Sequence, residues 1–503
     1  MSSDPQTTAA TLLDEPAIER ATDALVASLQ RHGARQGDRV AVLAGICPEM
    51  VVAREALAAA GMAMVPLDPR AAPPELAFVL VHARPALVLH QPSGAVELAA
   101  SKAADRILPF RRPQLIPLDR VTAEHAEPGG AATRPAPRAL DAGAIGATLL
   151  YTSGTTGRPK GCVRTAEQEA ARARELVETY SITADDVHLV ACPLAYSAPG
   201  IFLRAARVVG AATALLPRFT PAGFLDAVAA TRASIFFLVP TQLQRLVSLP
   251  PEVRDAADLS SVRAVVVAGA PMSTALRRSA ISWLGKGKLW EFYGSTETGT
   301  ISILRPEAQL SHPDSVGRPA PGVDLRCDHT ADAPGEIFVR SPTVMSGYWN
   351  PITGAVEWPG AGDGYLSVGD LGHIGPSGYL HLVDRLHDTI ITGGVNVYPA
   401  EVERALALHP EVEAAVVIGQ ADPEWGQRVV ALVVRADDSA LTEETLRQHL
   451  RGNLAPHKIP KEIGFVGHEE IPRTASGKPI RRAAAAVVRR AQRETEKTPK
   501  LTR

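Results

Sequence analysis

Residues 149–161 read Leu-Leu-Tyr-Thr-Ser-Gly-Thr-Thr-Gly-Arg-Pro-Lys-Gly and begin inside a predicted strand, Ile145–Tyr151. The segment from Tyr151 to Lys160 contains two glycines, three threonines, a serine and a lysine. Glycine lets the backbone approach a ligand closely, and main-chain N–H groups, hydroxyls and a lysine can all donate to phosphate oxygens. A threonine- and glycine-rich surface turn is the plainer alternative. We predict a phosphate-binding loop whose contributing residues are Thr152, Ser153, Gly154, Thr155, Thr156, Gly157 and Lys160.

The spacing of this loop excludes one common type of nucleotide-binding loop. A Walker A loop needs the pattern Gly-x-x-x-x-Gly-Lys-Ser/Thr. Here Arg158 and Pro159 separate Gly157 from Lys160. The chain is therefore not predicted to be a P-loop NTPase.

The composition argues against nucleic-acid binding, a membrane span and a disulfide framework. Of the 503 residues, 46% are apolar, which is enough for a large buried core. The 54 acidic and 52 basic residues nearly balance, so no basic field points to nucleic acid. The four cysteines are widely spaced, which indicates neither disulfides nor a zinc site. No apolar run reaches the roughly 18 residues of a spanning helix, and a cytoplasmic protein is expected.

Strand and helix patterns alternate along most of the chain. The predicted strand Arg39–Ala44 precedes the predicted helix Met50–Ala60, and Val262–Ala268 is almost entirely Val and Ala, as in a strand buried on both faces. Such alternation predicts an α/β fold with parallel sheets covered by helices.

Past Gly317 the pattern changes to short strands separated by Gly and Pro, which predicts a small barrel-like β subdomain. After Arg385 the pattern predicts a compact α+β unit. We therefore expect a large N-terminal domain at residues 1–384, made of α/β subdomains and the β subdomain. A small mobile C-terminal domain is expected at residues 385–503.

The loop at 149–161 resembles the signature of the adenylate-forming superfamily. Members of this superfamily are acyl-CoA synthetases, adenylation domains of nonribosomal peptide synthetases and beetle luciferases. The pattern Ser-Gly-Thr-Thr-Gly-x-Pro-Lys-Gly matches in full, and further motifs follow in the family's order between Ala17 and the region of Arg482. The resemblance implies that the large domain binds ATP and that closure of the small domain completes the site.

Residues 292–297, Phe-Tyr-Gly-Ser-Thr-Glu, resemble the second motif of the family. The resemblance implies that Tyr293 lies against adenine, Thr296 contacts phosphate and Glu297 holds Mg²⁺. A carboxylate suits this role, because Mg²⁺ is commonly bound by one or two carboxylates together with phosphates.

A turn after the predicted strand Val262–Ala268 resembles a family turn that lies beside the adenine and the acyl group. Its residues are Gly269, Ala270 and Pro271. A simple strand-ending turn explains the same residues about as well.

Two later residues are assigned to the ribose by resemblance. Asp370 ends the segment Asp-Gly-Tyr-Leu-Ser-Val-Gly-Asp, and Arg385 follows Asp384. A carboxylate can accept hydrogen bonds from both ribose hydroxyls, and the matching arginine of the family also contacts the ribose.

Two segments of the C-terminal part resemble motifs that serve the thiol and the chemical step. Gly394 belongs to a Gly-Gly-x-Asn-Val motif, which in acyl-CoA synthetases helps to form the tunnel for the thiol. Lys478 ends a Thr-x-Ser-Gly-Lys motif that carries the mobile catalytic lysine. A lysine can bridge the attacking carboxylate and the α-phosphate, which lowers the repulsion between the two anions.

The segment 193–200, Pro-Leu-Ala-Tyr-Ser-Ala-Pro-Gly, bears on the acid that is activated. Members that use α-amino acids carry Asp at the position of Tyr196, where it pairs with the ammonium group, so an α-amino acid is not expected here. Tyr196 is expected to line an acyl pocket together with Phe202, Val239, Ala268 and Ser295. These residues do not separate an aryl acid from a fatty acid.

The chain is therefore predicted to be an AMP-forming acid–thiol ligase with ATP and Mg²⁺ as cofactors. A small carboxylic acid becomes an acyl-AMP, with Lys478, Thr296 and Glu297 as the catalytic residues, and coenzyme A is the favoured acceptor. An acyl carrier protein, an amine or another nucleophile is the alternative acceptor. A non-catalytic nucleotide or acyl binder is disfavoured because Lys478 and Glu297 are both present.

Overall fold

The structure, a computed structural model, describes residues 9–91, 114–118, 147–152, 159–330, 333–360, 362–392, 395–436, 439–451, 453–473, 479–481 and 483–488. The chain forms two compact units. Unit 1 comprises Met1–Leu325 and Val339–Leu366, and unit 2 comprises Arg326–Phe338 and Ser367–Arg503. The expected domain boundary between residues 384 and 385 falls inside unit 2 and stays a prediction.

Unit 1 contains two eight-stranded sheets. In pairing order, the first sheet consists of β1 (Thr11–Leu12), β9 (Ala212–Leu215), β8 (Val187–Val190), β10 (Ile235–Leu238), β11 (Ala264–Val267), β12 (Leu289–Ser295), β13 (Gly299–Leu304) and β14 (Arg318–Pro319). The second consists of β18 (Ala355–Glu357), β17 (Gly347–Asn350), β7 (Lys160–Arg164), β6 (Thr148–Thr152), β3 (Ala63–Leu67), β2 (Arg39–Leu43), β4 (Leu87–His90) and β5 (Gln114–Pro117). The run from β9 to β12 and the run from β6 to β5 are parallel, whereas the flanking strands pair antiparallel.

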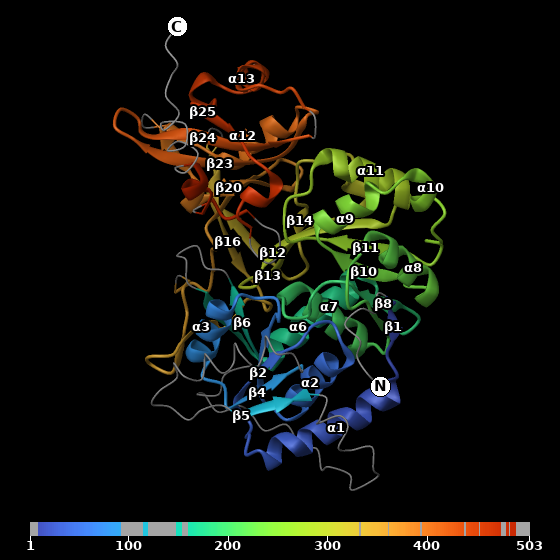
Figure 1. The fold of residues 1–503 in the computed structure, drawn as a ribbon. Coiled ribbons are helices and arrows are strands. Elements are labelled where there is room, and N and C mark those ends of the chain that lie inside the picture. The colour runs from blue at the N-terminus through green and yellow to red at the C-terminus, as the bar shows by residue number, and fades with distance from the viewer. Residues whose placement is uncertain are drawn as a thin grey trace, which may run out of the picture. The chain divides into compact units, whose positions relative to one another are not determined.

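Helices cover both faces of each sheet (Figure 1). The described helical elements of unit 1 are α1 (Glu15–Arg31), α2 (Pro48–Ala59), α3 (Pro73–Ala83), α6 (Ala166–Tyr180), α7 (Ser197–Val208), α8 (Pro221–Thr231), α9 (Pro240–Val247), α10 (Pro251–Arg254), α11 (Thr274–Leu284) and the 3₁₀ turn η1 (Pro306–Ala308). In the first sheet, α6 and α7 pack on one face and α8, α9 and α11 on the other. In the second sheet, α3 packs on one face and α1 and α2 on the other. The α/β architecture predicted from the alternating pattern is confirmed.

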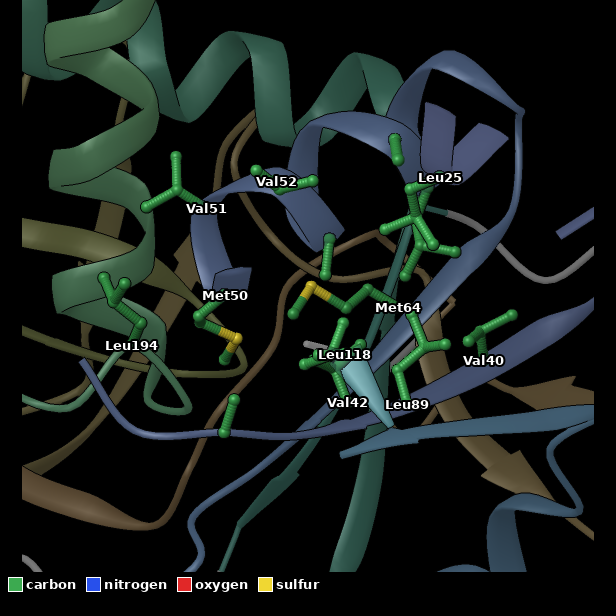
Figure 2. Close-up of a cluster of buried hydrophobic side chains, with 14 of the residues drawn as sticks. Leu25, Val40, Val42, Met50, Val51, Val52, Met64, Leu89, Leu118 and Leu194 are labelled. Atoms are coloured by element: carbon green, nitrogen blue, oxygen red, sulfur yellow. The ribbon is translucent and has the colours of Figure 1, made fainter. Parts of the chain in front are cut away.

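The largest core cluster lies where α1 and α2 meet the second sheet. Figure 2 shows Leu25 of α1 and Met50 of α2 pointing toward Val42 and Met64 of the sheet. All four side chains are at most 3% exposed. Burial on this scale stabilises a fold by about 25 cal/mol per Å² of apolar surface, which explains why the central strands are nearly all apolar.

One buried acidic side chain elsewhere in unit 1 links stability to pH. Glu175 lies on α6 and is 8% exposed, and burial raises its pKa from 4.5 to about 7. Between these two values the folded chain keeps a proton that the unfolded chain has lost. The contribution of this proton to the free energy of unfolding is therefore fully present below pH 4.5. It is lost as the pH rises through the folded-state pKa of about 7.

The substitution Glu175→Gln is expected to remove this loss of stability. The free energy of unfolding of the variant, relative to wild type, should increase by up to about 3 kcal/mol from pH 5 to pH 8. Urea unfolding at several pH values measures the change. Glu178→Gln, at an exposed position of the same helix, is the control. Parallel stability curves for wild type and Glu175→Gln would contradict the prediction.

Unit 2 contains two smaller sheets. One has the order β15 (Asp324–Cys327), β16 (Gly335–Arg340), β19 (Asp370–Ile374) and β20 (Leu380–Arg385), and it corresponds to the small β subdomain expected past Gly317. The other has the order β22 (Val395–Val397), β21 (Ile390–Thr392), β24 (Gly426–Arg435) and β23 (Val412–Asp422), with β25 (Glu462–Phe465) beside β24. Its helical elements are η2 (Leu386–Asp388), α12 (Pro399–Ala407), α13 (Glu443–Arg451), η3 (Pro456–Lys458) and η4 (His468–Glu470).

Residues from α12 and α13 share one core cluster with the second sheet of unit 2. This arrangement is the compact α+β unit that the sequence predicted. Within the ranges that the structure describes, no helix combines the length and apolarity that crossing a membrane requires.

Candidate active site

A tight turn between β12 and β13 holds Thr296 and Glu297 of the second motif, whose other residues lie on β12. The Oγ atom of Ser295 accepts hydrogen bonds from the main-chain N–H groups of Glu297 (3.1 Å) and Thr298 (3.2 Å). The Oγ1 atom of Thr298 in turn accepts from the N–H of Ser295 (3.1 Å). The hydroxyl of Ser295, expected in the acyl pocket, therefore fixes the turn on which Thr296 and Glu297 lie.

The carboxylate of Glu297 joins three segments of unit 1. Its Oε1 atom accepts hydrogen bonds from the hydroxyl of Thr152, at the end of β6, and from the hydroxyl of Tyr348, on β17, both at 3.1 Å. No residue of the described part of the chain donates to Oε2. The side chain is half-buried, and the two hydroxyls hold its Oε1 atom in place.

Lys160 lies beside Tyr348, the residue that donates to Glu297. Its Nζ atom is 5.0 Å from the ring centroid of Tyr348, a distance that allows a cation–π contact. Burial, and then the charge of Glu297, raise the pKa of the Tyr348 phenol, which therefore stays a hydrogen-bond donor. In the described ranges no carboxylate forms an ion pair with Lys160. Tyr348 thus contacts a lysine charge through its ring and a glutamate carboxylate through its hydroxyl.

The structure shows where the predicted phosphate loop starts and ends. Thr152 on β6 and Lys160 on β7 are direct antiparallel partners, so the chain leaves and returns at one point. The remaining predicted loop residues lie outside the described residues: Ser153, Gly154, Thr155, Thr156 and Gly157. The same holds for Gly394 and Lys478.

The Gly-Ala-Pro turn directly follows β11, the strand next to β12. Gly269 has φ +96°, in the region where glycine is favoured, and Ala270 and Pro271 continue the turn. Tyr293 lies near the carboxyl end of β12, which runs parallel to β11. In open α/β sheets ligands bind at the carboxyl ends of the strands. The Gly-Ala-Pro turn and Tyr293 both lie at this edge of the sheet, where a ligand could bind.

Tyr196 has a charged neighbour that the sequence analysis missed. Its hydroxyl donates to Oδ2 of Asp68 at 3.1 Å, and the Nη2 of Arg70 lies 2.7 Å from the same oxygen. Burial alone would raise the pKa of Asp68, but hydrogen bonds from Arg70 lower it, so the carboxylate stays ionised. Asp68 follows β3, and its place at a strand end is the signal that could have found it.

Three expected acyl-pocket residues share one apolar cluster. Phe202 is fully buried, its ring centroid 5.6 Å from that of Phe237 and 6.3 Å from that of Phe292. Val239 and Ala268 pack in the same cluster. The structure therefore brings these residues together, but it buries Phe202 completely in the core rather than exposing it on an open surface.

In unit 2 the two expected ribose-binding residues are paired. Asp370 on β19 and Arg385 on β20 are direct cross-strand partners, and the Nε of Arg385 donates to Oδ1 of Asp370 at 3.1 Å. The exposed arginine side chain therefore covers part of the buried carboxylate. This is the only pair of predicted site residues in unit 2 that the structure describes.

Comparison with known proteins gives the class of the chain. The AMP-binding enzyme family matches residues 17–349, and the AMP-binding enzyme C-terminal domain matches residues 401–478. The chain belongs to the AMP-binding enzymes, and the predicted membership of the adenylate-forming superfamily is confirmed.

Three relatives describe this membership more closely. Feruloyl-CoA synthase of an Amycolatopsis species is 35% identical, over 93% of this chain and 92% of its own length. Indoleacetate–CoA ligase of Aromatoleum aromaticum is 33% identical, over 92% and 89%. The structure of the amide bond synthetase McbA from Marinactinospora thermotolerans superposes with a TM-score of 0.81 at 32% identity, covering 93% of each chain. The chain is an AMP-forming acid–thiol ligase by class, which confirms the predicted ATP-dependent ligation of an acid to CoA.

Proposed function

We propose that the enzyme converts an aryl-substituted carboxylic acid into its CoA thioester through an acyl-AMP. The observation that carries the site assignment is the half-buried Glu297 carboxylate, held by Thr152 and Tyr348 beside Lys160. We assign the triphosphate to the loop between Thr152 and Lys160, and the adenine to Tyr293 and the Gly-Ala-Pro turn.

The remaining roles follow from the motifs. Thr296 contacts a phosphate, and Asp370 and Arg385 bind the ribose. Lys478 bridges the attacking carboxylate and the α-phosphate. Gly394 lines the path of the thiol.

The residues around Glu297 suit a Mg²⁺ ion. No cluster of three or more His, Cys, Asp or Glu side chains able to hold a metal occurs among the described residues. Mg²⁺ does not require such a cage, because it is held by one or two carboxylates together with substrate phosphates and water. When bound, it would neutralise charge on the phosphates. Glu297 would then supply the carboxylate through Oε2, while Thr152 and Tyr348 fix its orientation.

The aromatic residues that share a core cluster with Ala268 support an aryl acid over an amino acid as the substrate. The rings of Phe202, Phe237 and Phe292 pack together in one apolar cluster, and the hydroxyl of Tyr196 is bound to Asp68. The carboxylate of Asp68 is already paired with Arg70, so it does not offer a free partner to an ammonium group. Two relatives named above act on feruloyl and indoleacetate groups, which both carry an aromatic ring.

The hydrogen bond between Tyr196 and Asp68 should affect binding of the acid. Both Tyr196→Phe and Asp68→Ala are expected to raise the KM for the acid by about 3- to 10-fold and to leave the KM for ATP within twofold. Since both changes break one interaction, the double variant should be no worse than the poorer single variant. Additive losses in steady-state kinetics would contradict a shared role.

The likeness to an amide bond synthetase favours one alternative acceptor, an amine. A carrier-protein thiol is a further alternative. Acid-dependent exchange of pyrophosphate into ATP tests the first half-reaction, with a panel of aryl, short-chain, long-chain and amino-substituted acids. Aryl acids should give the fastest exchange. No exchange with any acid would contradict the proposal and would revive a non-catalytic binder.

Product analysis with CoA, an amine or a carrier protein then identifies the acceptor. We expect the thioester of CoA to dominate. We also propose that the enzyme acts in the cytoplasm, where its four free cysteines would remain reduced.

A further inference from the structure

A fully buried arginine donates a hydrogen bond to the turn that carries Glu297. Arg164, the last residue of β7, is 0% exposed. Its Nη1 atom donates to the main-chain carbonyl of Thr343, and its Nη2 atom donates to the main-chain carbonyl of Thr296. The planar guanidinium thus holds two chain segments at once.

The nearest acidic group does not account for this arginine. Glu169 lies 4.0 Å from the Nε of Arg164, but it is closer to Arg172, at 3.3 Å, and accepts from the hydroxyl of Thr148 at 2.9 Å. Burial lowers the pKa of Arg164 to about 10, so the side chain stays charged near neutral pH. Burying a cation costs several kcal/mol unless hydrogen bonds compensate, and here main-chain carbonyls supply two of them.

The two carbonyls belong to the segments that carry Glu297 and its hydrogen-bond donor Tyr348. Thr296 immediately precedes Glu297, and Thr343 starts the segment that leads to Tyr348, whose hydroxyl donates to Glu297. Further bonds join the same segments: the N–H of Met345 donates to the carbonyl of Glu297 at 2.8 Å, and the hydroxyl of Thr343 donates to the carbonyl of Thr298 at 3.2 Å. Arg164 therefore fixes both the main chain that carries Glu297 and the strand that carries its hydrogen-bond donor.

We propose that Arg164 is a positioning residue that holds the Glu297 carboxylate in the geometry that binds the divalent cation. This inference rests on the proposed role of Glu297 as the Mg²⁺ ligand. Arg164 acts through main-chain carbonyls and does not itself touch the metal or the nucleotide. A lysine would keep the charge but would replace the planar fork by a single ammonium group, so it cannot reproduce both bonds with the same geometry.

The test compares Arg164→Lys with a matched arginine elsewhere in unit 1. Arg263 also donates to two main-chain carbonyls, of Tyr180 (2.7 Å) and Ser181 (3.1 Å), and pairs with Asp186. Arg263→Lys therefore controls for the general cost of replacing such an arginine. Mn²⁺ binding is followed by electron paramagnetic resonance in the presence of a non-hydrolysable ATP analogue.

Arg164→Lys should weaken Mn²⁺ binding by about tenfold or more, whereas Arg263→Lys should leave it within twofold of wild type. The Mg²⁺ concentration for half-maximal pyrophosphate exchange should rise in parallel, with the KM for the acid unchanged. If Arg164→Lys does not fold, Arg164→Met is measured instead, because it leaves no buried charge and should show the same weakened binding.

Unchanged Mn²⁺ affinity in a folded Arg164 variant would overturn the inference and leave Arg164 a purely structural residue. Failure of the proposed function is distinguishable. In that case wild type itself would give no acid-dependent exchange, while its Mn²⁺ affinity could still be compared with that of the variants.

Discussion

Replacing Lys478 with alanine is expected to lower acid-dependent pyrophosphate exchange by about two to three orders of magnitude. In the first half-reaction a carboxylate attacks the α-phosphate, and both partners are anionic. A lysine that bridges them stabilises the charge that is shared in the transition state. Lys478 lies outside the described residues, so this expectation rests on the motif and on the charge balance of the reaction.

The second half-reaction separates this role from a general loss of activity. Thiol attack on the acyl-AMP does not bring two anionic phosphate and carboxylate groups together. The Lys478→Ala variant, given a synthetic acyl-AMP and CoA, should therefore form thioester at a rate within about tenfold of wild type. Lys286→Ala, at an exposed position after α11, is the control for loss of a lysine. An equal loss in both half-reactions would contradict the assigned role.

The sequence alone predicted the elements whose pattern is strongly periodic or continuously apolar. The predicted strand Val262–Ala268 contains β11 (Ala264–Val267), and the predicted helix Met50–Ala60 overlaps α2 (Pro48–Ala59). In such segments, burial on one or both faces leaves few alternatives for the backbone. The distribution of the short strands past Gly317 was not predictable, because β14 joins the first sheet of unit 1 and β17 the second. Pairing between strands distant in sequence leaves no local pattern.

Contacts between residues distant in sequence also explain why the sequence predicted some site residues and not others. Thr152 and Glu297 belong to dense motifs, although their hydrogen bond spans 145 residues of sequence. Asp68 accepts a hydrogen bond from Tyr196, which lies 128 residues further along the chain, and it belongs to none of the motifs identified in the sequence. Arg164 belongs to none of the motifs identified in the sequence, and only the structure shows that it is fully buried. A buried charge can be explained only from its partners, and sequence spacing does not provide them.

The substitution Glu297→Gln should have an effect comparable to that of Lys478→Ala, through the metal. Glutamine has almost the same shape as glutamate, and its carbonyl oxygen can still accept from the hydroxyls of Thr152 and Tyr348. The charge that attracts Mg²⁺ is lost. We expect exchange at limiting Mg²⁺ to fall by about 100-fold or more, with thermal stability almost unchanged.

A Mg²⁺ titration of exchange rates, together with a melting curve for each variant, measures both effects. Tyr348→Phe is the matched comparison, because it removes one hydrogen bond to Oε1 and keeps the carboxylate charge. Its loss should stay below about tenfold. Exchange by Glu297→Gln within threefold of wild type at limiting Mg²⁺ would rule out Glu297 as the metal ligand. If its rate recovers fully at high Mg²⁺, the carboxylate only concentrates the ion. A rate that stays low would mean that the carboxylate also orients the metal in the transition state.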